Sequence, residues 1–442
     1  MTATDDKTNG ETAACVAAFE NFSKAVPAPE WLGALRTTGI SHFTELGFPT
    51  QKHEEWVFTN TKPIQDLAFL PASRPSGTSP DLSPFAFSGL AGPRLVFVDG
   101  HLSHALSEIP TLPKEVTVSN LASAIETRAE LVEQHLGRHA KTDASGFSAL
   151  NTAFIQDGAF IHLPRTTTVE GPIHLVFIAT DGDASTINLR NLIIAEAGSE
   201  AKIIESYHSA GDQAVFSNVV TEVVVAQDAR IEHCKFQDQN RESFHVATIQ
   251  AQLAPNSHFT SHSISTGSRI ARNDINLVMN GEHVECVMNG LYLVGDHQLV
   301  DHHTVADHAM PNCDSHEYYH GVLGDQSRGV FNGKIFVRED AQKTDAKQSS
   351  RAILLSEKAT VNAKPQLEIF ADDVKCTHGA TVGQLNNEAI FYCRSRGIDE
   401  GDARRLLTHA FAGEVIERIS IPAVREHLEK VIWDRLEELI ED

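Results

Sequence analysis

The sequence predicts a mainly β protein built around a parallel β-helix, with helical regions before and after it. From residue 160 to about residue 376, β-branched runs alternate with Gly, Asn, Asp and Ser, and no convincing helical pattern appears. Turn-type residues recur in this segment at intervals typical of one coil of a solenoid. Amphipathic helical patterns occupy the chain on either side.

The repeat is weak and irregular. Its turn residues, each beside a short apolar segment, are Gly198, Asp228, Asn256, Gly281 and Asp325. They are separated by 30, 28, 25 and 44 residues, and the last interval is interpreted as a double one. Stacked coils of this length would bury one continuous core. A β-sandwich, which also has many short strands separated by turns, is the alternative.

The predicted organisation has three parts. Residues 1–158 form a mainly helical region, in which Pro63 should interrupt any helix. Within this region, a linker or exposed loop occupies 71–84, a strand with a turn occupies 94–100, and a helix runs from about 119 to 136. The β-helix core takes residues 159–383. A C-terminal helical domain, 384–442, contains helices over 386–396, 400–416 and 423–440.

Composition excludes several classes of function. With 36 basic and 59 acidic residues the net charge is −23, and no basic block stands out, which argues against nucleic-acid binding. No apolar run approaches the roughly 20 residues that span a bilayer. The first residues resemble no secretion or import signal, so we expect a cytoplasmic protein whose six scattered cysteines are reduced.

Sequence motifs for common enzymatic chemistry are absent. The chain has no nucleophile elbow, no P-loop and no G-x-G-x-x-G fingerprint. We therefore expect that it does not bind nucleotide or catalyse acyl transfer by itself, and that it is not an enzyme.

The first candidate site is Cys376 with His378. On an extended strand, residues two apart project from the same face, so a thiol and an imidazole would lie together. Both are good ligands for iron and other transition metals. The alternative, favoured by the residues alone, is a buried cysteine beside a hydrogen-bonded histidine, because two ligands do not close a site.

A second candidate is the histidine-rich stretch 296–321. Its repeated Asp-His dipeptides could supply metal ligands with carboxylate neighbours; the stretch contains His297, His302, His303, His308, Cys313, His316 and His320. The spacings match no compact zinc signature. Polar ladders of this kind also satisfy buried groups at the turns of a solenoid, and we favour that structural interpretation.

A third candidate is a basic cluster near the C-terminus of an otherwise acidic chain. It combines arginines with apolar anchors in Arg394, Arg396, Arg404, Arg405, Leu406, Leu407 and Phe411. Such a combination is typical of a partner-binding surface, and equally of an ordinary solvated helix face.

Four segments carry a resemblance to a known family. They are EEWVFTN at 54–60, the DHHT and PNCDS region, RGVFNGKIFVREDAQKTDAKQ at 328–348, and the segment around Cys376. Together they resemble the SufB/SufD family of scaffold proteins from the Suf iron-sulfur cluster assembly machinery. The resemblance implies a right-handed parallel β-helix flanked by helical parts.

Within that family the segment after His378 separates two branches. SufB-like members place a glutamate there, whereas Gly379 resembles the SufD-like branch. The resemblance then implies a non-enzymatic scaffold that pairs with a SufB-like chain through the end of the β-helix. His378 would lie at that interface, with Cys376 as a secondary contributor. Transient iron or a nascent cluster would be shared there between the chains and would not be held stably by one chain alone. The helices over 388–416 would dock the SufC ATPase.

Two rival functions remain at this stage. One is a SufB-like principal scaffold, which would assemble a cluster without a partner. The other is a β-helical carbohydrate-active enzyme, which would need a cleft lined by acidic and basic groups along the solenoid. The sequence leaves open whether iron, a flavin or sulfur passes through the chain, and whether isolated chains form homodimers.

Overall fold

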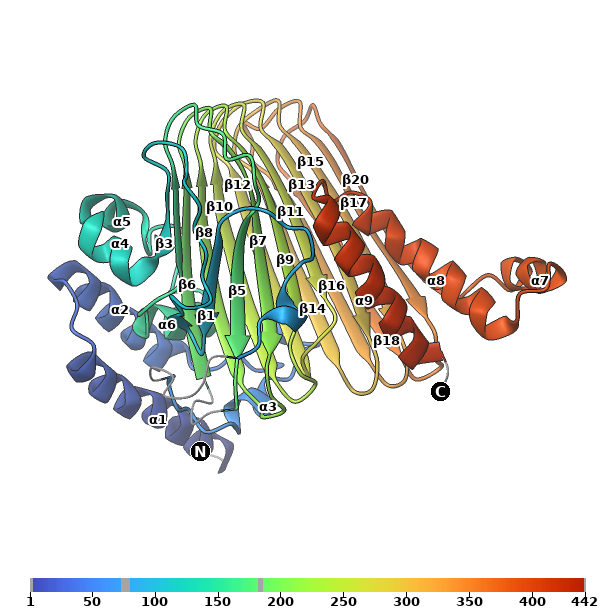
Figure 1. The fold of residues 1–442 in the computed structure, drawn as a ribbon, viewed down its shortest axis with the longest axis horizontal. Coiled ribbons are helices and arrows are strands. Elements are labelled where there is room, and N and C mark those ends of the chain that lie inside the picture. The colour runs from blue at the N-terminus through green and yellow to red at the C-terminus, as the bar shows by residue number, and fades with distance from the viewer. Residues whose placement is uncertain (1–2, 73–79, 182–185, 441–442) are drawn as a thin grey trace.

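The computed structural model describes residues 3–72, 80–181 and 186–440. It confirms a parallel β-helix flanked by helices, and the sandwich alternative is wrong, because strands alternate between two sheets and pair in parallel with the strand two further along the chain. Figure 1 shows the two sheets running across the molecule, with helices packed at both ends. Half of the predicted linker, residues 73–79, lies outside the described residues.

The N-terminal region is mainly helical. Its helices are α1 (Ala3–Ala25), α2 (Glu30–Leu46), the 3-10 turn η1 (Glu54–Trp56), α3 (Lys62–Gln65), the 3-10 turn η2 (Ser83–Phe85), α4 (Leu121–Thr127), α5 (Ala129–His135) and α6 (Gly146–Ala153). Two predictions need correction. Pro63 lies in the first turn of α3, where a missing N–H costs nothing, so it begins a helix. The helix expected over 119–136 is divided at Arg128, whose φ of −133° is not helical.

The first strands belong to the same region. The expected strand and turn are β1 (Arg94–Val98) and β2 (His101–Leu102), joined by a tight turn at Asp99 and Gly100, both of which have positive φ. β3 (Thr117–Asn120) precedes α4. Because β1 pairs in parallel with a strand of the solenoid, parallel pairing begins before residue 159.

The solenoid strands follow without an intervening helix among the described residues. They are β4 (Ala159–Leu163), β5 (Ile173–Ala179), β6 (Thr186–Ala195), β7 (Glu200–Ser209), β8 (Phe216–Val225), β9 (Arg230–Asp238), β10 (Phe244–Leu253), β11 (His258–Ser265), β12 (Ile270–Met279), β13 (Glu285–Val294), β14 (Leu299–His308), β15 (Asp314–Leu323), β16 (Arg328–Val337), β17 (Asp345–Leu354), β18 (Thr360–Ala363), β19 (Gln366–Ile369) and β20 (Lys375–Gly383).

Alternate strands build the two sheets. The odd sheet has the order β2-β1-β5-β7-β9-β11-β13-β15-β17-β20, and the even sheet has the order β18-β16-β14-β12-β10-β8-β6-β4-β3, with β19 also pairing with β16. Each coil therefore contributes one strand to each sheet. The registers of the odd sheet from Glu200 to Lys375 give coils of 27 to 31 residues.

The corners explain why the sequence repeat looks irregular. One series of left-handed residues lies two positions before each odd strand from β7 to β17, and it consists of Gly198, Asp228, Asn256, His283, Asn312 and Lys343. The first three agree with the predicted turns. The predicted turn at Gly281 is instead at His283, and Asp325 belongs to the opposite corner, which precedes the even strands. The interval of 44 residues is therefore not a double coil.

The core fills the space between the sheets and has reciprocal packing near its C-terminal end. Tyr319 is opposite Gly290 in the register, and Tyr292 is opposite Gly321. A Cβ atom at Gly321 would lie 2.2 Å from the Tyr292 ring, and one at Gly290 would lie 2.0 Å from the Tyr319 ring. Each tyrosine therefore occupies space that a glycine on the next strand leaves open.

Helices cover the outer faces of both sheets. The N-terminal helices pack on the even sheet, where Phe147 of α6 contacts Phe216 of β8. The predicted C-terminal helices are α7 (Asn387–Ser395), α8 (Glu400–Ile416) and α9 (Pro422–Ile440). α8 and α9 lie on the odd sheet, and the apolar stripe of α9 is buried against this same chain. Figure 1 shows α7 projecting away from the sheets.

Within the described residues, no helix has both the length and the apolar character needed to cross a membrane.

Candidate functional site

The end of the odd sheet is an open strand. β20 pairs with β17 along one edge, and among the described residues no strand pairs with its other edge. Most of its side chains are exposed. An unpaired edge presents a row of free backbone N–H and C=O groups, which is a template for another strand.

Cys376 and His378 lie on the same face of β20. Cys376 is in register with Ala346 and His378 with Gln348, and both of these β17 residues are buried inside the solenoid. Cys376 packs against the apolar cluster that contains Ile335. His378 continues the same inward-facing row, but it is exposed because it lies at the open end.

Cys376 is partly buried, whereas His378 is exposed. Partial burial and the carboxylate of Asp345 raise the pKa of the Cys376 thiol, which favours its protonated form. In the part of the chain that the structure describes, no group of three or more His, Cys, Asp or Glu side chains could hold a metal ion. This face therefore offers two potential ligands, and a complete coordination shell would need ligands from elsewhere.

A buried polar ladder leads to His378 from inside the solenoid. Glu317 of β15, Gln348 of β17 and His378 of β20 occupy successive positions of one register. Thr304 Oγ1 donates to Glu317 Oε2 at 2.8 Å, and Gln348 Nε2 donates to the same oxygen at 3.0 Å. Burial raises the pKa of Glu317 to about 7, although these two hydrogen bonds oppose the rise.

The histidine-rich stretch is tied into the solenoid by hydrogen bonds. His302 contacts Ser263 and Asn273, His308 contacts Ser315 and Thr344, His320 Nδ1 contacts the Phe411 carbonyl, and Cys313 contacts the Gly281 carbonyl. His303 contacts Asp301 and Glu55, whereas His316 is half-buried and His297 is exposed. These contacts support a structural role for most of the stretch.

The C-terminal arginines divide into two groups. Arg394 pairs with Glu400, and Arg396 lies over the Tyr392 ring; both arginines are exposed on the projecting helix. Arg404 donates to the Leu355 carbonyl, and Arg405 lies over Trp433 of α9, so this second pair holds α8 to its own chain.

The apolar residues of the same cluster also differ. Leu406 is 44% exposed and Leu407 is half-buried, whereas Phe411 is 8% exposed and stacks on His320 with ring centroids 4.3 Å apart. Phe411 therefore belongs to the packed interior of this chain. Sequence reasoning overlooked Phe391 and Tyr392, which are 72% and 59% exposed. The only signal for them was two adjacent aromatic residues in a short arginine-bearing helix.

A large recess lies elsewhere, on the outer face of the even sheet beside the N-terminal layer. It has a volume of about 480 Å³ and is lined by both acidic and basic groups. Those groups pair with one another: Arg272 with Asp274, His303 with Glu55, and Arg338 with Asp307. The His303–Glu55 pair joins the N-terminal layer to the even sheet, whereas the other two pairs lie along that sheet.

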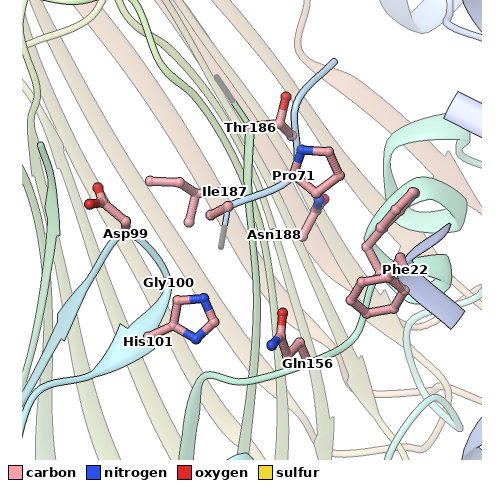
Figure 2. A pocket seen from close by; sticks show the side chains of 11 residues that line it. Phe22, Pro71, Asp99, Gly100, His101, Gln156, Thr186, Ile187 and Asn188 are labelled. Atoms are coloured by element: carbon pink, nitrogen blue, oxygen red, sulfur yellow. The ribbon is translucent and has the colours of Figure 1, made fainter. Parts of the chain in front are cut away.

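A smaller cavity lies at the start of the solenoid. Figure 2 shows that its lining comes from α1, the β1–β2 turn, β6 and the segments at Pro71 and Gln156. Its volume is about 20 Å³, which suits roughly one water molecule.

The fold and its end strand define a class of protein, a parallel β-helix whose open end presents a Cys-x-His face. Comparison with known families agrees. A family model described as the SUF system FeS cluster assembly, SufBD core domain, matches residues 177–411, and one described as the SufBD protein N-terminal region matches residues 19–175. The chain belongs to the SufBD family of iron-sulfur cluster assembly proteins.

Similar relatives span most of its length. The iron-sulfur cluster assembly protein SufD of Escherichia coli is 32% identical over 401 residues, which is 90% of this chain and 91% of the relative. A SufBD family protein of Synechocystis is 30% identical over 88% of this chain and 87% of its own length. SufD of Bacillus subtilis is 27% identical over 94% of this chain and 96% of its own length.

Proposed function

We propose that this chain is a SufD-type, non-enzymatic scaffold subunit of a cytoplasmic Suf complex. It supports iron acquisition and nascent cluster formation at an interface with a SufB-type partner. The observation that carries the proposal is the Cys376–His378 face on an exposed end strand whose outer edge is unpaired among the described residues. Membership of the family and the SufD relatives support it.

The partner interface that we propose is the open end of the solenoid. A strand from the partner can extend the odd sheet by pairing with the free edge of β20. Exposed apolar side chains flank that edge: Phe370 is 61% exposed, Val382 is 45% exposed and Ile369 is 37% exposed. Burying them against a partner would stabilise the complex by removing apolar surface from water.

His378 is the proposed iron ligand from this chain. A neutral imidazole is a good ligand for iron, and it is exposed at the end where a partner would bring further ligands. Cys376 is a weaker contributor, because partial burial favours its protonated thiol over the thiolate that binds metal. The iron is cargo shared between two chains.

The proposed docking surface for a SufC-type ATPase is the projecting helix α7 with the exposed part of α8. It consists of Phe391, Tyr392, Arg394, Arg396 and Leu406. Exposed aromatic and arginine side chains of this kind dominate many protein interfaces. ATP hydrolysis would remain with the partner.

The test is co-expression with a SufB-type scaffold and a SufC-type ATPase, followed by anaerobic isolation and analysis of iron and sulfide. His378→Ala should leave the complex intact and deplete its iron. His297→Ala, which removes another exposed histidine, is the control and should change nothing.

Other outcomes would contradict the proposal at different points. An intact His378→Ala complex with unchanged iron would make His378 a structural residue. Failure of the wild-type chain to form a complex would remove the SufD-type assignment. A stable cluster on the isolated chain would favour the principal-scaffold role instead.

A further inference from the structure

The inward-facing ladder at the open end contains a residue that the proposed function does not use. Gln348 is 3% exposed and occupies the register position between Glu317 and His378. Its side chain therefore has a carboxyl group on one side and an imidazole on the other.

The orientation of the Gln348 carboxamide follows from its neighbours. Its Nε2 donates to Glu317 Oε2 at 3.0 Å. The carboxamide also lies over Gly333 of β16, where a Cβ atom would come within 2.2 Å of Nε2. Because a glycine occupies that position, the side chain has the room to hold this conformation. The amide nitrogen is thus committed to Glu317.

The other end of the carboxamide has no partner. Gln348 Oε1 is buried and accepts no hydrogen bond within the described structure. A buried carbonyl oxygen without a donor is unfavourable, and such groups are rare in folded proteins. The next side chain of the ladder, on the side away from Glu317, is His378.

The spacing of the ladder suits a hydrogen bond between them. Adjacent strands lie about 4.8 Å apart, so register neighbours on one face are within reach of each other. Gln348 already spans one such step to reach Glu317. His378 is exposed and can turn about its side-chain torsions, so a ring N–H can reach Oε1 across the next step.

We propose that Gln348 is a positioning residue, whose free carboxamide oxygen accepts a hydrogen bond from the His378 imidazole and thereby directs the other ring nitrogen toward the open end of the β-helix. Metal-binding histidines generally donate their second ring N–H to a carbonyl or carboxylate, which fixes the tautomer and the ring orientation. Glu317 and Thr304 hold Gln348 in place for this contact. The consequence for iron rests on the proposed function, whereas the hydrogen bond itself does not.

The variants separate the hydrogen bond from packing. Gln348→Leu keeps a similar volume and removes the acceptor. Gln348→Glu keeps an oxygen facing His378 and serves as the conservative rescue, with one proton shared between the two carboxyl groups in place of the Nε2 donor, because burial already raises the pKa of Glu317. Ser350→Ala is the matched control, because Ser350 is a buried polar residue on the same face of the same strand, opposite Ala380. Gln348→Asn, which retracts the amide by one methylene, replaces the leucine variant if that variant does not fold.

The first measurement is made on the isolated full-length chain without iron. The ring ¹⁵N resonances of His378, assigned by their loss in His378→Ala, report which nitrogen is protonated. We expect one dominant tautomer in the wild type, the Gln348→Glu variant and the Ser350→Ala variant, and a mixture in Gln348→Leu or Gln348→Asn. Unchanged resonances in a folded variant that lacks the acceptor would refute the hydrogen bond.

The second measurement is the iron content of the complex with the scaffold and ATPase partners. Removing such a supporting hydrogen bond typically weakens metal affinity about 10–100-fold, so Gln348→Leu should approach the iron content of His378→Ala, while Gln348→Glu retains iron. Unchanged iron in Gln348→Leu together with depleted iron in His378→Ala would overturn the inference and leave the proposed function standing. Unchanged iron in both would overturn the proposed function, and the tautomer measurement would still decide the hydrogen bond.

Discussion

Glu222 links the N-terminal helical region to the outer face of the even sheet. Its side chain and that of Arg190 are fully buried, and Arg190 Nη2 donates to Glu222 Oε2 at 2.7 Å. The same carboxylate accepts backbone N–H bonds from Gly137, His139 and Ala140 at 2.8 to 3.0 Å. Burial alone would raise the pKa of Glu222, but Arg190 and these N–H groups hold it below its usual value.

Replacing Glu222 by glutamine keeps the shape and removes the charge. The amide places an NH₂ group where an oxygen accepted hydrogen bonds, and it leaves the Arg190 guanidinium buried without a counter-charge. Breaking a buried ion pair by removing one partner costs about 3–5 kcal/mol. We expect Glu222→Gln to lower the free energy of unfolding of the N-terminal layer by that amount.

The assay is equilibrium urea unfolding followed by the fluorescence of Trp31 and Trp56, which both lie in the N-terminal layer, in a Trp433→Phe background that removes the third tryptophan, on α9. The control is Asp296→Asn, the same chemical change in an exposed pair with Arg241, where the loss should stay within about 1 kcal/mol. Equal losses for the two variants would refute the argument, because the buried pair would then contribute no more than a surface pair.

Two further predictions concern pH and docking. Burial alone would lower the pKa of His303, but Asp301 and Glu55 raise it from 6.5 to about 9. The stability that protonated His303 adds is therefore complete below about pH 6.5 and is lost as the pH rises through about 9. The difference in unfolding free energy between wild type and His303→Gln should shrink by about 3 kcal/mol between pH 6 and pH 10. A difference independent of pH would contradict this. Phe391→Ser should change the free energy of unfolding by less than about 0.5 kcal/mol and weaken binding to the ATPase partner at least about tenfold in a titration. The control is Ile109→Ser, because Ile109 is exposed in another part of the chain. Equal binding by both variants would exclude Phe391 from the interface.

The repeat could be recognised from the sequence at three of the corners whose residue types suit a left-handed backbone; Asn312, which also suits it, was overlooked. Gly198, Asp228 and Asn256 are residue types that tolerate positive φ, and they revealed the repeat. Lys343 occupies the same corner although its side chain disfavours positive φ, and His283 is not among the usual turn residues, so residue type does not mark those two coils. There the paired strands on either side of the corner determine the backbone, and pairing partners about 30 residues apart are invisible to a local pattern.

The candidate site was predictable only to the extent that it is local. Cys376 and His378 share a face because side chains alternate along a strand, and their spacing of two residues is visible in the sequence. Gln348 and Glu317 join them only through the register of separate coils. Phe411 shows the converse limit, because an apolar residue on a helix has the same pattern whether it packs on its own chain or on a partner.

The inward ladder that ends at His378 changes character along the solenoid. Ile173 and Ile203 begin it, His233, Ser261 and Met288 follow, and Glu317, Gln348 and His378 end it. A solenoid that ends in solvent needs a cap over its last coil, since the core would otherwise be open to water. In this row the final positions carry hydrogen-bonding groups, so the exposed end tolerates water in the isolated chain and offers donors and acceptors to a partner. A partner that covers this end must satisfy the outward ring nitrogen of His378 as it excludes water, because burying an unpaired polar group costs about 1–3 kcal/mol. The hydrogen-bonding groups that orient the proposed ligand therefore also determine which partner can cover this end of the fold.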